Sequence, residues 1–362
     1  MKKSVQRIVS GIAAVGMMLS VGAAATPASA SADDEYKVLV VSETLGFRHS
    51  HIDDTTLAVI KLGQENGFTV DVWDPRQTTR TLATTPFTTA ADLSRYATII
   101  FASPVDGTND LNPLRPRLLD DVELSAFQGY IRGGGGFVGL HAATDSMHAV
   151  PWYSALTGGG ARFSGHPAQQ TATMRVESPT HPSTAMLPAE WERFDEWYNF
   201  TTNPREDVHV LITLDESTYS PGSGAMGADH PLAWCQNFEG ARSWYEGAGH
   251  IDENYSDPLF LGHILGGIEW TAGVVSGGGD CVTFGEVDEV LAGLNDGSLR
   301  YAQLSAQLAR SLDDAEIAAD AGDHAFATAT LQKAWARAHG LGDDALVSKI
   351  DDLITWQQGL LS

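Results

Sequence analysis

The segment that most constrains the fold is a glycine run followed by a short apolar strand and a histidine. It reads Gly133-Gly-Gly-Gly-Phe-Val-Gly-Leu-His-Ala-Ala-Thr-Asp145. This order predicts a nucleophile elbow, the sharp turn that presents one side chain above an α/β sheet. The presented residue is His141, where a hydrolase would have Ser or Cys. The turn therefore predicts a chemical site that does not form an acyl-enzyme.

The first thirty residues have the pattern of a secretory signal peptide. Lys2, Lys3 and Arg7 precede an apolar stretch of small residues, and Ala28-Ser-Ala30 has the form of a cleavage site. We expect cleavage after Ala30 and an extracellular mature chain. The alternative, a membrane anchor, is less favoured because the apolar run is short and interrupted by glycine. No later segment is long and apolar enough to span a membrane.

Charge and cysteine content narrow the class of protein further. The formal net charge of −24 argues against nucleic acid and anionic membrane surfaces as partners. Cys235 and Cys281 are the two cysteines of the sequence. In a secreted chain an even number of cysteines favours a disulfide, and the absence of a C-x-x-C pair argues against redox and thiolate–zinc roles.

Strands and helices alternate in the first half of the chain. Apolar, β-branched runs predict strands at 37–42, 68–73, 98–102 and 137–140, and helices fit 53–66 and 120–132. This spacing predicts a doubly wound, mainly parallel α/β sheet. Further strands are expected at 173–177, 209–214, 231–235 and 242–245, either extending the sheet or folding over its carboxyl edge, before a helix at 257–271.

The composition changes after this helix. We expect an α/β domain over 31–275, a glycine-rich linker over 276–285 and a helical module over 286–362, with helices at 299–309, 313–322, 325–337 and 344–357. The module is either a solvated appendage or a docking surface for the cell surface or another protein.

Several histidines follow strands or lie in glycine-flanked turns, where ligands of open α/β sheets bind. They are His49, His141, His166 and His250. Four such residues at one edge indicate a shared site, although each alone could be structural. Asp195 and Glu196 lie among aromatic residues; burial would suit one carboxyl group to acid–base work, and a loop salt bridge is the alternative. Asp145 could orient His141 or cap the next helix.

At these residues the chain resembles the trehalose-utilisation (ThuA-like) family, within the class I glutamine-amidotransferase-like superfamily. The resemblance covers about Lys37 to Gly273 and lies in seven ordered motifs. They are Gly46-Phe-Arg-His49, Gly134 to Asp145, Phe163 with His166-Pro167, Phe194-Asp-Glu-Trp-Tyr198, His230 to Cys235, Gly240 to His250 and Gly262 to Trp270.

The resemblance implies a flavodoxin-like sheet and a site where amidotransferases keep their cysteine. It also implies a link to disaccharide use, to proteins described as secreted glycosyl hydrolases, and to 3-keto-glycosides. Because position 141 is His and Cys235 lies on another strand, glutamine hydrolysis is rejected.

The resulting hypothesis is a secreted protein that cleaves glycosides or keto-glycosides. His141 and His250 would act as base or metal ligand, Glu196 as acid–base partner, and Asp145 and Asp195 as further catalytic candidates. Arg48, His49, Trp152, Trp197 and Tyr198 are the candidates for substrate binding. A divalent metal on His49, His141, His166 and His250 could polarise the substrate, and its identity stays open. The alternatives are a non-catalytic carbohydrate-binding protein and a structural protein of the envelope.

Overall fold

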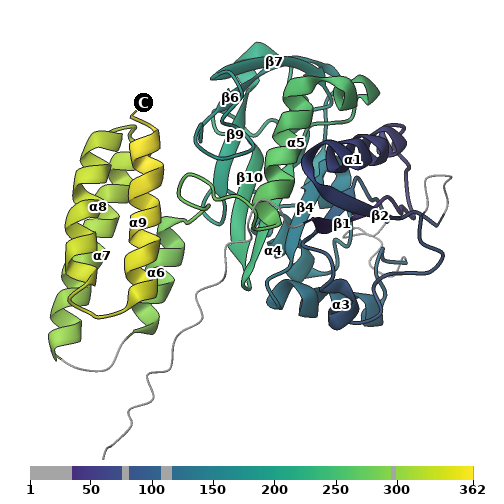
Figure 1. Ribbon diagram of the computed structural model, residues 1–362. Helices are drawn as coiled ribbons and strands as arrows, with labels where there is room; N and C mark the ends of the chain where they lie inside the picture. The colour runs from purple at the N-terminus through teal and green to yellow at the C-terminus, as the bar shows by residue number, and fades with distance from the viewer. Residues whose placement is uncertain (1–34, 76–80, 107–115, 295–298, 362) are drawn as a thin grey trace, which may run out of the picture.

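The computed structural model describes residues 35–75, 81–106, 116–294 and 299–361. Within them the largest element is a nine-stranded mixed sheet in the order β2-β1-β3-β4-β11-β10-β9-β6-β7 (Figure 1). Its strands are β1 (Tyr36–Val41), β2 (Phe68–Trp73), β3 (Thr98–Ala102), β4 (Gly136–Leu140), β6 (Gln170–Val176), β7 (Glu190–Asp195), β9 (His209–Asp215), β10 (Pro231–Phe238) and β11 (Ala241–Glu246). Two short strands, β5 (Phe163–Gly165) and β8 (Asn199–Phe200), pair separately.

One half of the large sheet is parallel and contains the predicted doubly wound core. β1 pairs with β2 and β3, β3 with β4, and β4 with β11, all in parallel. β1, β3, β4 and β11 are almost wholly buried, as expected for apolar runs covered on both faces. The predicted flavodoxin-like α/β class is therefore confirmed, and the ends of β1, β3, β4 and β11 meet at one edge.

The other half of the sheet is antiparallel. β10 turns back from β11, and β9, β6 and β7 follow, each antiparallel to its neighbour. Of the two arrangements left open by the sequence, these strands extend the sheet. β7 also contacts the start of a helix: the Arg193 guanidinium lies 3.0 Å from the carboxylate of Asp257, the residue before α5 (Pro258–Thr271).

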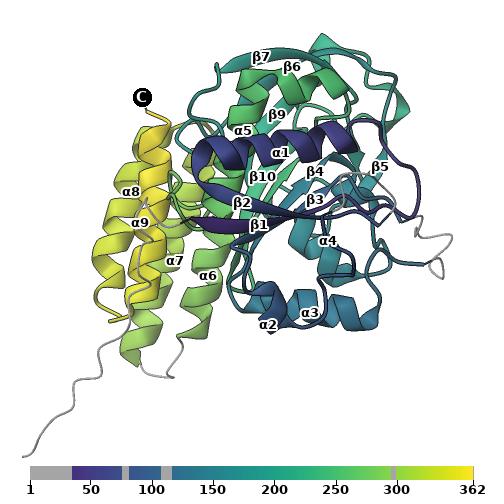
Figure 2. The ribbon, with the colours of Figure 1, turned by 45° about the vertical axis from the view of Figure 1, so that its right-hand side comes forward.

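Helices cover both faces of the sheet (Figure 2). One face carries α1 (Ile52–Asn66) and α5 (Pro258–Thr271), and the other carries α2 (Ala90–Leu93), α3 (Asp121–Arg132) and α4 (Pro151–Gly158). Short 3₁₀ helices η1 (His141–Asp145), η2 (Glu216–Thr218), η3 (Gly222–Gly224) and η4 (Asp252–Ser256) connect the other elements. The sheet thus separates two apolar cores, and the site lies along one of its edges.

The C-terminal part is a helical bundle with an apolar core of its own. It comprises α6 (Phe284–Gly293), α7 (Leu299–Asp320), α8 (His324–Ala338) and α9 (Asp344–Gly359). The prediction of two helices over 299–322 was wrong. The segment Leu299–Asp320 contains no Gly or Pro, and Leu308, Leu312 and Ala315 form one continuous buried stripe, so a single helix α7 forms.

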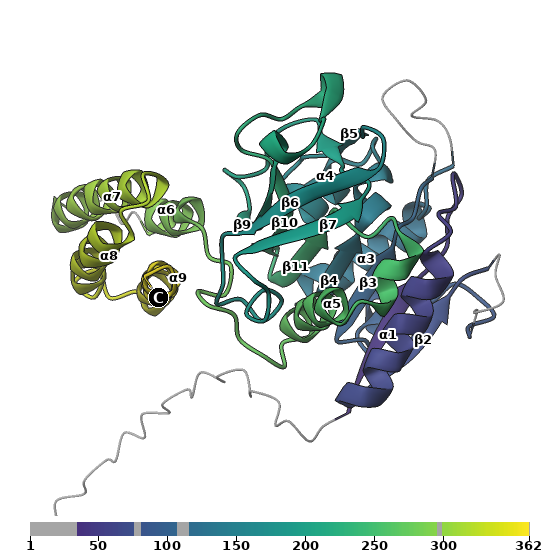
Figure 3. The same cartoon turned by 90° about the horizontal axis from the view of Figure 1, so that it is seen from above.

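The predicted disulfide is present in the structure. Cys235 on β10 is bonded to Cys281 in the connector before α6, with their Cα atoms 5.8 Å apart. The bundle lies beside the β9–β10 side of the sheet, away from α1 and β2 (Figure 3). The ring of Trp356 on α9 packs 4.2 Å from the ring of His209 on β9. The connector, the disulfide and this ring contact together join the bundle to the α/β domain.

Two expectations concern membranes and export. In the described part of the chain, none of the helices has the length and apolarity needed to cross a membrane. The predicted signal peptide and its cleavage site lie outside the described residues, so the sequence alone supports that expectation.

Candidate active site

The site is built around the elbow that follows β4. His141 has a φ of +45°, in the left-handed region that non-glycine residues seldom adopt. Its Nδ1 lies 2.9 Å from the carbonyl oxygen of Gly247, which follows β11. Because a carbonyl only accepts, Nδ1 carries a proton, and Nε2 faces the interior of the site.

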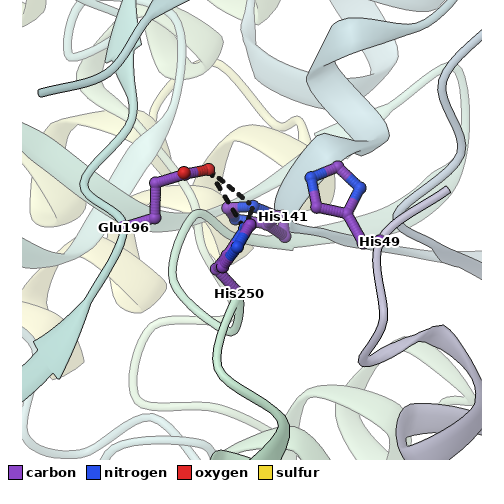
Figure 4. A group of neighbouring side chains, drawn as sticks. All are labelled: His49, His141, Glu196 and His250. Carbon is purple, nitrogen blue, oxygen red and sulfur yellow. Dashed lines mark hydrogen bonds and ion pairs between the residues drawn. The ribbon is translucent and has the colours of Figure 1, made fainter. Parts of the chain in front are cut away.

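Four side chains from separate segments converge at this point (Figure 4). His49 follows β1, His141 follows β4, Glu196 follows β7 and His250 follows β11. One potential ligand atom from each lies within 4.8 Å of all the others. Glu196 Oε2 is 3.1 Å from His250 Nδ1 and 3.5 Å from His141 Nε2, and the two ring nitrogens are 3.3 Å apart.

The electrostatics of the cluster differ from ring to ring. Burial, together with neighbouring His141 and His250, lowers the pKa of His49 to about 3, so this ring is neutral. A hydrogen bond to Glu196 raises the pKa of His250. Burial opposes ionisation of Glu196, but the neighbouring His141 and His250 hold the pKa of its carboxyl group below the usual range. The cluster therefore combines a carboxylate with at least one neutral imidazole.

This donor set suits a divalent transition metal. Three imidazoles and one carboxylate are ligands of zinc and related ions in proteins. The buried Nδ1 of His49 has no hydrogen-bond partner among the described residues, which is costly for a polar atom unless a ligand satisfies it. Both observations fit a metal held by His49, His141, Glu196 and His250.

His166 joins the cluster through Glu196. Its Nδ1 lies 3.2 Å from Glu196 Oε1, on the opposite oxygen from His141 and His250, and also 2.9 Å from the carbonyl of Pro167. Its side chain is 40% exposed, in contrast to the buried ring of His141. The predicted role as a metal ligand remains a prediction, because Glu196 rather than His166 completes the tight group.

Asp195 touches the site through the backbone. Its carboxylate accepts hydrogen bonds from the N–H groups of Glu196, Gly249 and His250 and from the side chain of Asn254, at 2.7 to 2.9 Å. Burial raises its pKa, while the backbone donors act against that shift. These contacts favour a positioning role for Asp195 over direct contact with substrate.

Two other charged candidates are engaged elsewhere. Asp145 accepts from His148 at 3.0 Å, and the N-cap of α4 is Val150, so Asp145 neither orients His141 nor caps that helix. Gly247 holds His141 instead. The Arg48 guanidinium lies 2.9 Å from the buried carboxylate of Asp74 and 3.0 Å from Asp53, so it braces the β1–α1 loop.

The aromatic candidates are distributed differently from the prediction. Trp152 donates to Glu239 in the β10–β11 turn, at the end of β11 opposite to the site. Trp197 is fully buried in the core and donates to the carbonyl of Gln170. Only Tyr198 reaches the cluster, where its buried ring lies 4.0 Å from that of His141. Trp197 and Tyr198 are neighbours in the chain, and their side chains point in opposite directions, one into the core and one toward the cluster. Composition does not reveal this difference.

Sequence reasoning missed two residues at the mouth and base of the site. His51 is fully buried, hydrogen-bonded to Ser103 and Thr55, with its ring 5.7 Å from that of His141. Phe47 is 65% exposed, and its ring lies edge-on to His49. Both belong to the β1–α1 loop that contains His49, so the rule that selected His49 would also have found them.

The sheet and the strand-end cluster define a flavodoxin-like α/β protein with a histidine–carboxylate site. A family model described as "Trehalose utilisation" (ThuA) matches residues 37–271, more than half of the chain. The chain therefore belongs to the ThuA family, and the resemblance inferred from the motifs is confirmed. The matched segment contains every residue of the cluster, whereas the helical bundle lies outside it.

Solved structures agree with this assignment. A putative ThuA-like protein from Bacteroides uniformis is 26% identical, with a TM-score of 0.52, and the match covers 68% of this chain and 95% of that one. A putative ThuA-like protein from Parabacteroides merdae is 19% identical, with a TM-score of 0.50 and coverage of 66% and 90%. The second likeness concerns the fold alone. No curated protein matches the sequence.

Proposed function

We propose that this chain is a secreted carbohydrate-active enzyme that cleaves glycosides or keto-glycosides at the cluster after β1, β4, β7 and β11. The observation that carries the proposal is the convergence of three histidines and one carboxylate at the carboxyl edge of the sheet. Membership of a family described by trehalose utilisation supports a sugar as substrate. The proposal of export rests on the N-terminal sequence and is compatible with the disulfide.

We assign a divalent metal to His49, His141, Glu196 and His250. When bound, the metal would supply Lewis-acid polarisation of a carbonyl or hydroxyl oxygen of the sugar. The protein contributes a neutral His49, a His141 whose Nδ1–H is held by Gly247, and a carboxylate between two rings. This assignment differs from the ligand set expected from the sequence by replacing His166 with Glu196.

His166 is our candidate for proton transfer. In a 3-keto-glycoside the ketone acidifies the proton on C2, and loss of that proton allows the C1 substituent to leave as its oxygen is protonated. His166 is partly exposed and its Nδ1 lies 3.2 Å from Glu196 Oε1, so it can exchange protons with solvent beside the cluster. A hydrolase in which Glu196 acts as general acid is the near alternative.

The test uses the purified mature chain with 4-nitrophenyl glucosides and their 3-keto derivatives. We expect turnover by the wild type, loss of at least a hundredfold in kcat for Glu196→Gln and His141→Ala, and loss on chelation that Zn²⁺ or Mn²⁺ restores. His324→Gln, in the helical bundle, is the matched control and should retain activity. Turnover that survives both site variants would refute the assignment of this cluster as the active site.

A non-catalytic carbohydrate-binding protein is the second candidate. The exposed ring of Phe47 beside His49 favours it, because aromatic faces pack on the apolar face of a sugar ring. Saturable binding of these glycosides by the wild type with no turnover, at any metal loading, would favour binding over catalysis.

The processing and domain boundaries belong to the same proposal. We assign residues 1–30 to a signal peptide, 31–275 to the catalytic domain, and 286–362 to a helical module that docks to another surface. Intact-mass analysis of the protein exported by the native host should give a chain beginning at Ser31. A mass that includes Met1 would contradict cleavage.

A further inference from the structure

In loop 247–250, which contains His250, every backbone N–H donates a hydrogen bond. Gly247 donates to the carbonyl of Leu232, Ala248 to Glu246 Oε1 at 2.6 Å, and Gly249 and His250 to Asp195 at 2.9 Å each. The same loop supplies the Gly247 carbonyl that holds His141. Its conformation therefore sets the place of two members of the cluster.

Glu246 has a second contact besides the hydrogen bond that it accepts from Ala248. Its other oxygen, Oε2, lies 2.6 Å from Nε2 of His263 on α5, and both side chains are fully buried. Nδ1 of His263 lies 2.7 Å from the carbonyl oxygen of Ser183 and must donate to it. The short contact between ring and carboxyl group therefore fixes the end of β11 to α5.

We propose that Glu246 and His263 are positioning residues that act through loop 247–250 on His141 and His250. Glu246 ends β11 and opens this loop, and His263 fixes its carboxyl group from α5. Neither side chain belongs to the four-residue cluster. The effect on cleavage rests on the function proposed above, whereas the effect on the ring of His141 rests only on these hydrogen bonds.

The geometry predicts that Gln, but not Leu, can replace Glu246. A Gln side chain can accept from Ala248 through its oxygen and donate through its amide to an unprotonated Nε2 of His263. Leu leaves the N–H of Ala248 and Nε2 of His263 without partners in the protein interior, so the loop must shift to satisfy them. Comparing Glu246→Gln with Glu246→Leu therefore separates the effect of losing the hydrogen bonds from the effect of changing the size of the side chain.

The experiment reads the ring of His141 directly, in the full chain treated with a chelator. In protein labelled with ¹⁵N-histidine, long-range ¹H–¹⁵N correlation should show His141 as a single Nδ1–H tautomer, assigned by its loss in His141→Gln. We expect this signal to persist in Glu246→Gln and to broaden or average in Glu246→Leu. If Glu246→Leu does not fold, Glu246→Asp, which is too short to reach both partners, should show the same averaging.

The matched control is Tyr130→Phe. The Tyr130 hydroxyl lies 3.1 Å from the carbonyls of Tyr96 and Gly136, at the opposite end of β4 from His141. This variant should lower stability yet leave the His141 tautomer unchanged. A single Nδ1–H tautomer in a folded Glu246→Leu or Glu246→Asp protein would overturn the proposal, as would averaging in Tyr130→Phe.

Zn²⁺ titration provides the second readout. Affinity should fall about 10- to 100-fold in Glu246→Leu and stay within about threefold of wild type in Glu246→Gln, as is typical when the support of a ligand is removed. A wild type that binds no Zn²⁺ would refute the metal assignment above, while the tautomer measurement would still decide the positioning role.

Discussion

At the residue scale, the histidines of the site are chemically different although they lie together. His49 is buried among other rings, which lowers its pKa to about 3, whereas Glu196 raises the pKa of His250. A ring that stays neutral offers a lone pair, and a ring beside a carboxylate readily carries a proton. One cluster can therefore bind a cation and handle protons without any unusual residue.

Arg48 provides a prediction at this scale. Replacing it with Met leaves the buried carboxylate of Asp74 without its guanidinium partner, which should lower the free energy of unfolding by about 3 kcal/mol. Urea denaturation measures the loss, and Arg48→Met with Asp74→Asn should recover part of it. A higher KM at unchanged stability would instead support the substrate-binding role expected from the sequence.

His209 gives a pH-dependent prediction. Burial, followed by the charge of Arg205, lowers its pKa to about 4, against 6.5 for the free side chain. Between these values the unfolded chain binds more protons, so stability falls as pH drops through this window, by about 3 kcal/mol in all. We expect His209→Gln to lose less stability than wild type between pH 7 and 4.5 in urea. The exposed His339→Gln control should follow wild type, and parallel curves for His209→Gln would refute the prediction.

At the element scale, β4 depends on a glycine at its first position. A Cβ atom on Gly136 would lie 2.2 Å from the carbonyl oxygen of Thr271 at the end of α5. We expect Gly136→Ala to lower the free energy of unfolding by about 3 kcal/mol, because backbone must move to make room. Gly293→Ala, where a Cβ meets nothing within 4 Å, is the control. Thermal denaturation of both variants tests this, and equal melting temperatures would contradict it.

The parallel half of the sheet was predictable because its strands are continuous apolar runs, such as 98–102. The strand β7 and the helix α4 were not predicted. β7 alternates exposed and buried residues with charged side chains, and α4 is only eight residues long. Such elements form because neighbours cover one face, and a single sequence does not show those neighbours.

The histidine cluster followed from one rule, that parallel strands end at the same edge. That rule brought together His49, His141 and His250. The rule does not say which side chains hydrogen-bond to one another. Asp145 was therefore linked to His141, although its hydrogen-bond partner is His148. It also gave no account of Trp152, which points to the far end of β11. Side-chain direction depends on packing between distant segments, which spacing does not encode.

At the scale of the whole molecule, the disulfide joins the α/β domain to the connector of the bundle. It closes a loop between cysteines 46 residues apart and should contribute about 4 kcal/mol by limiting the unfolded chain. We expect Cys235→Ala/Cys281→Ala to lower the free energy of unfolding by about that amount in urea. Reductant should bring wild type close to the double variant and leave the variant unchanged. A wild type insensitive to reductant while unfolding would contradict this.

The pairing of β11 with β4 has a consequence for how this protein can change. Glu246 lies opposite Leu140 and Ser243 opposite Phe137, so the two strands pair in one continuous register. An inserted residue in the Glu239-Gly240 turn that slid β11 by one place would turn its side chains to the other face. Loop 247–250 would then be misplaced by a change at the remote end of the hairpin. Length variation in descendants of this chain should therefore be excluded from that turn, however far it lies from the chemistry.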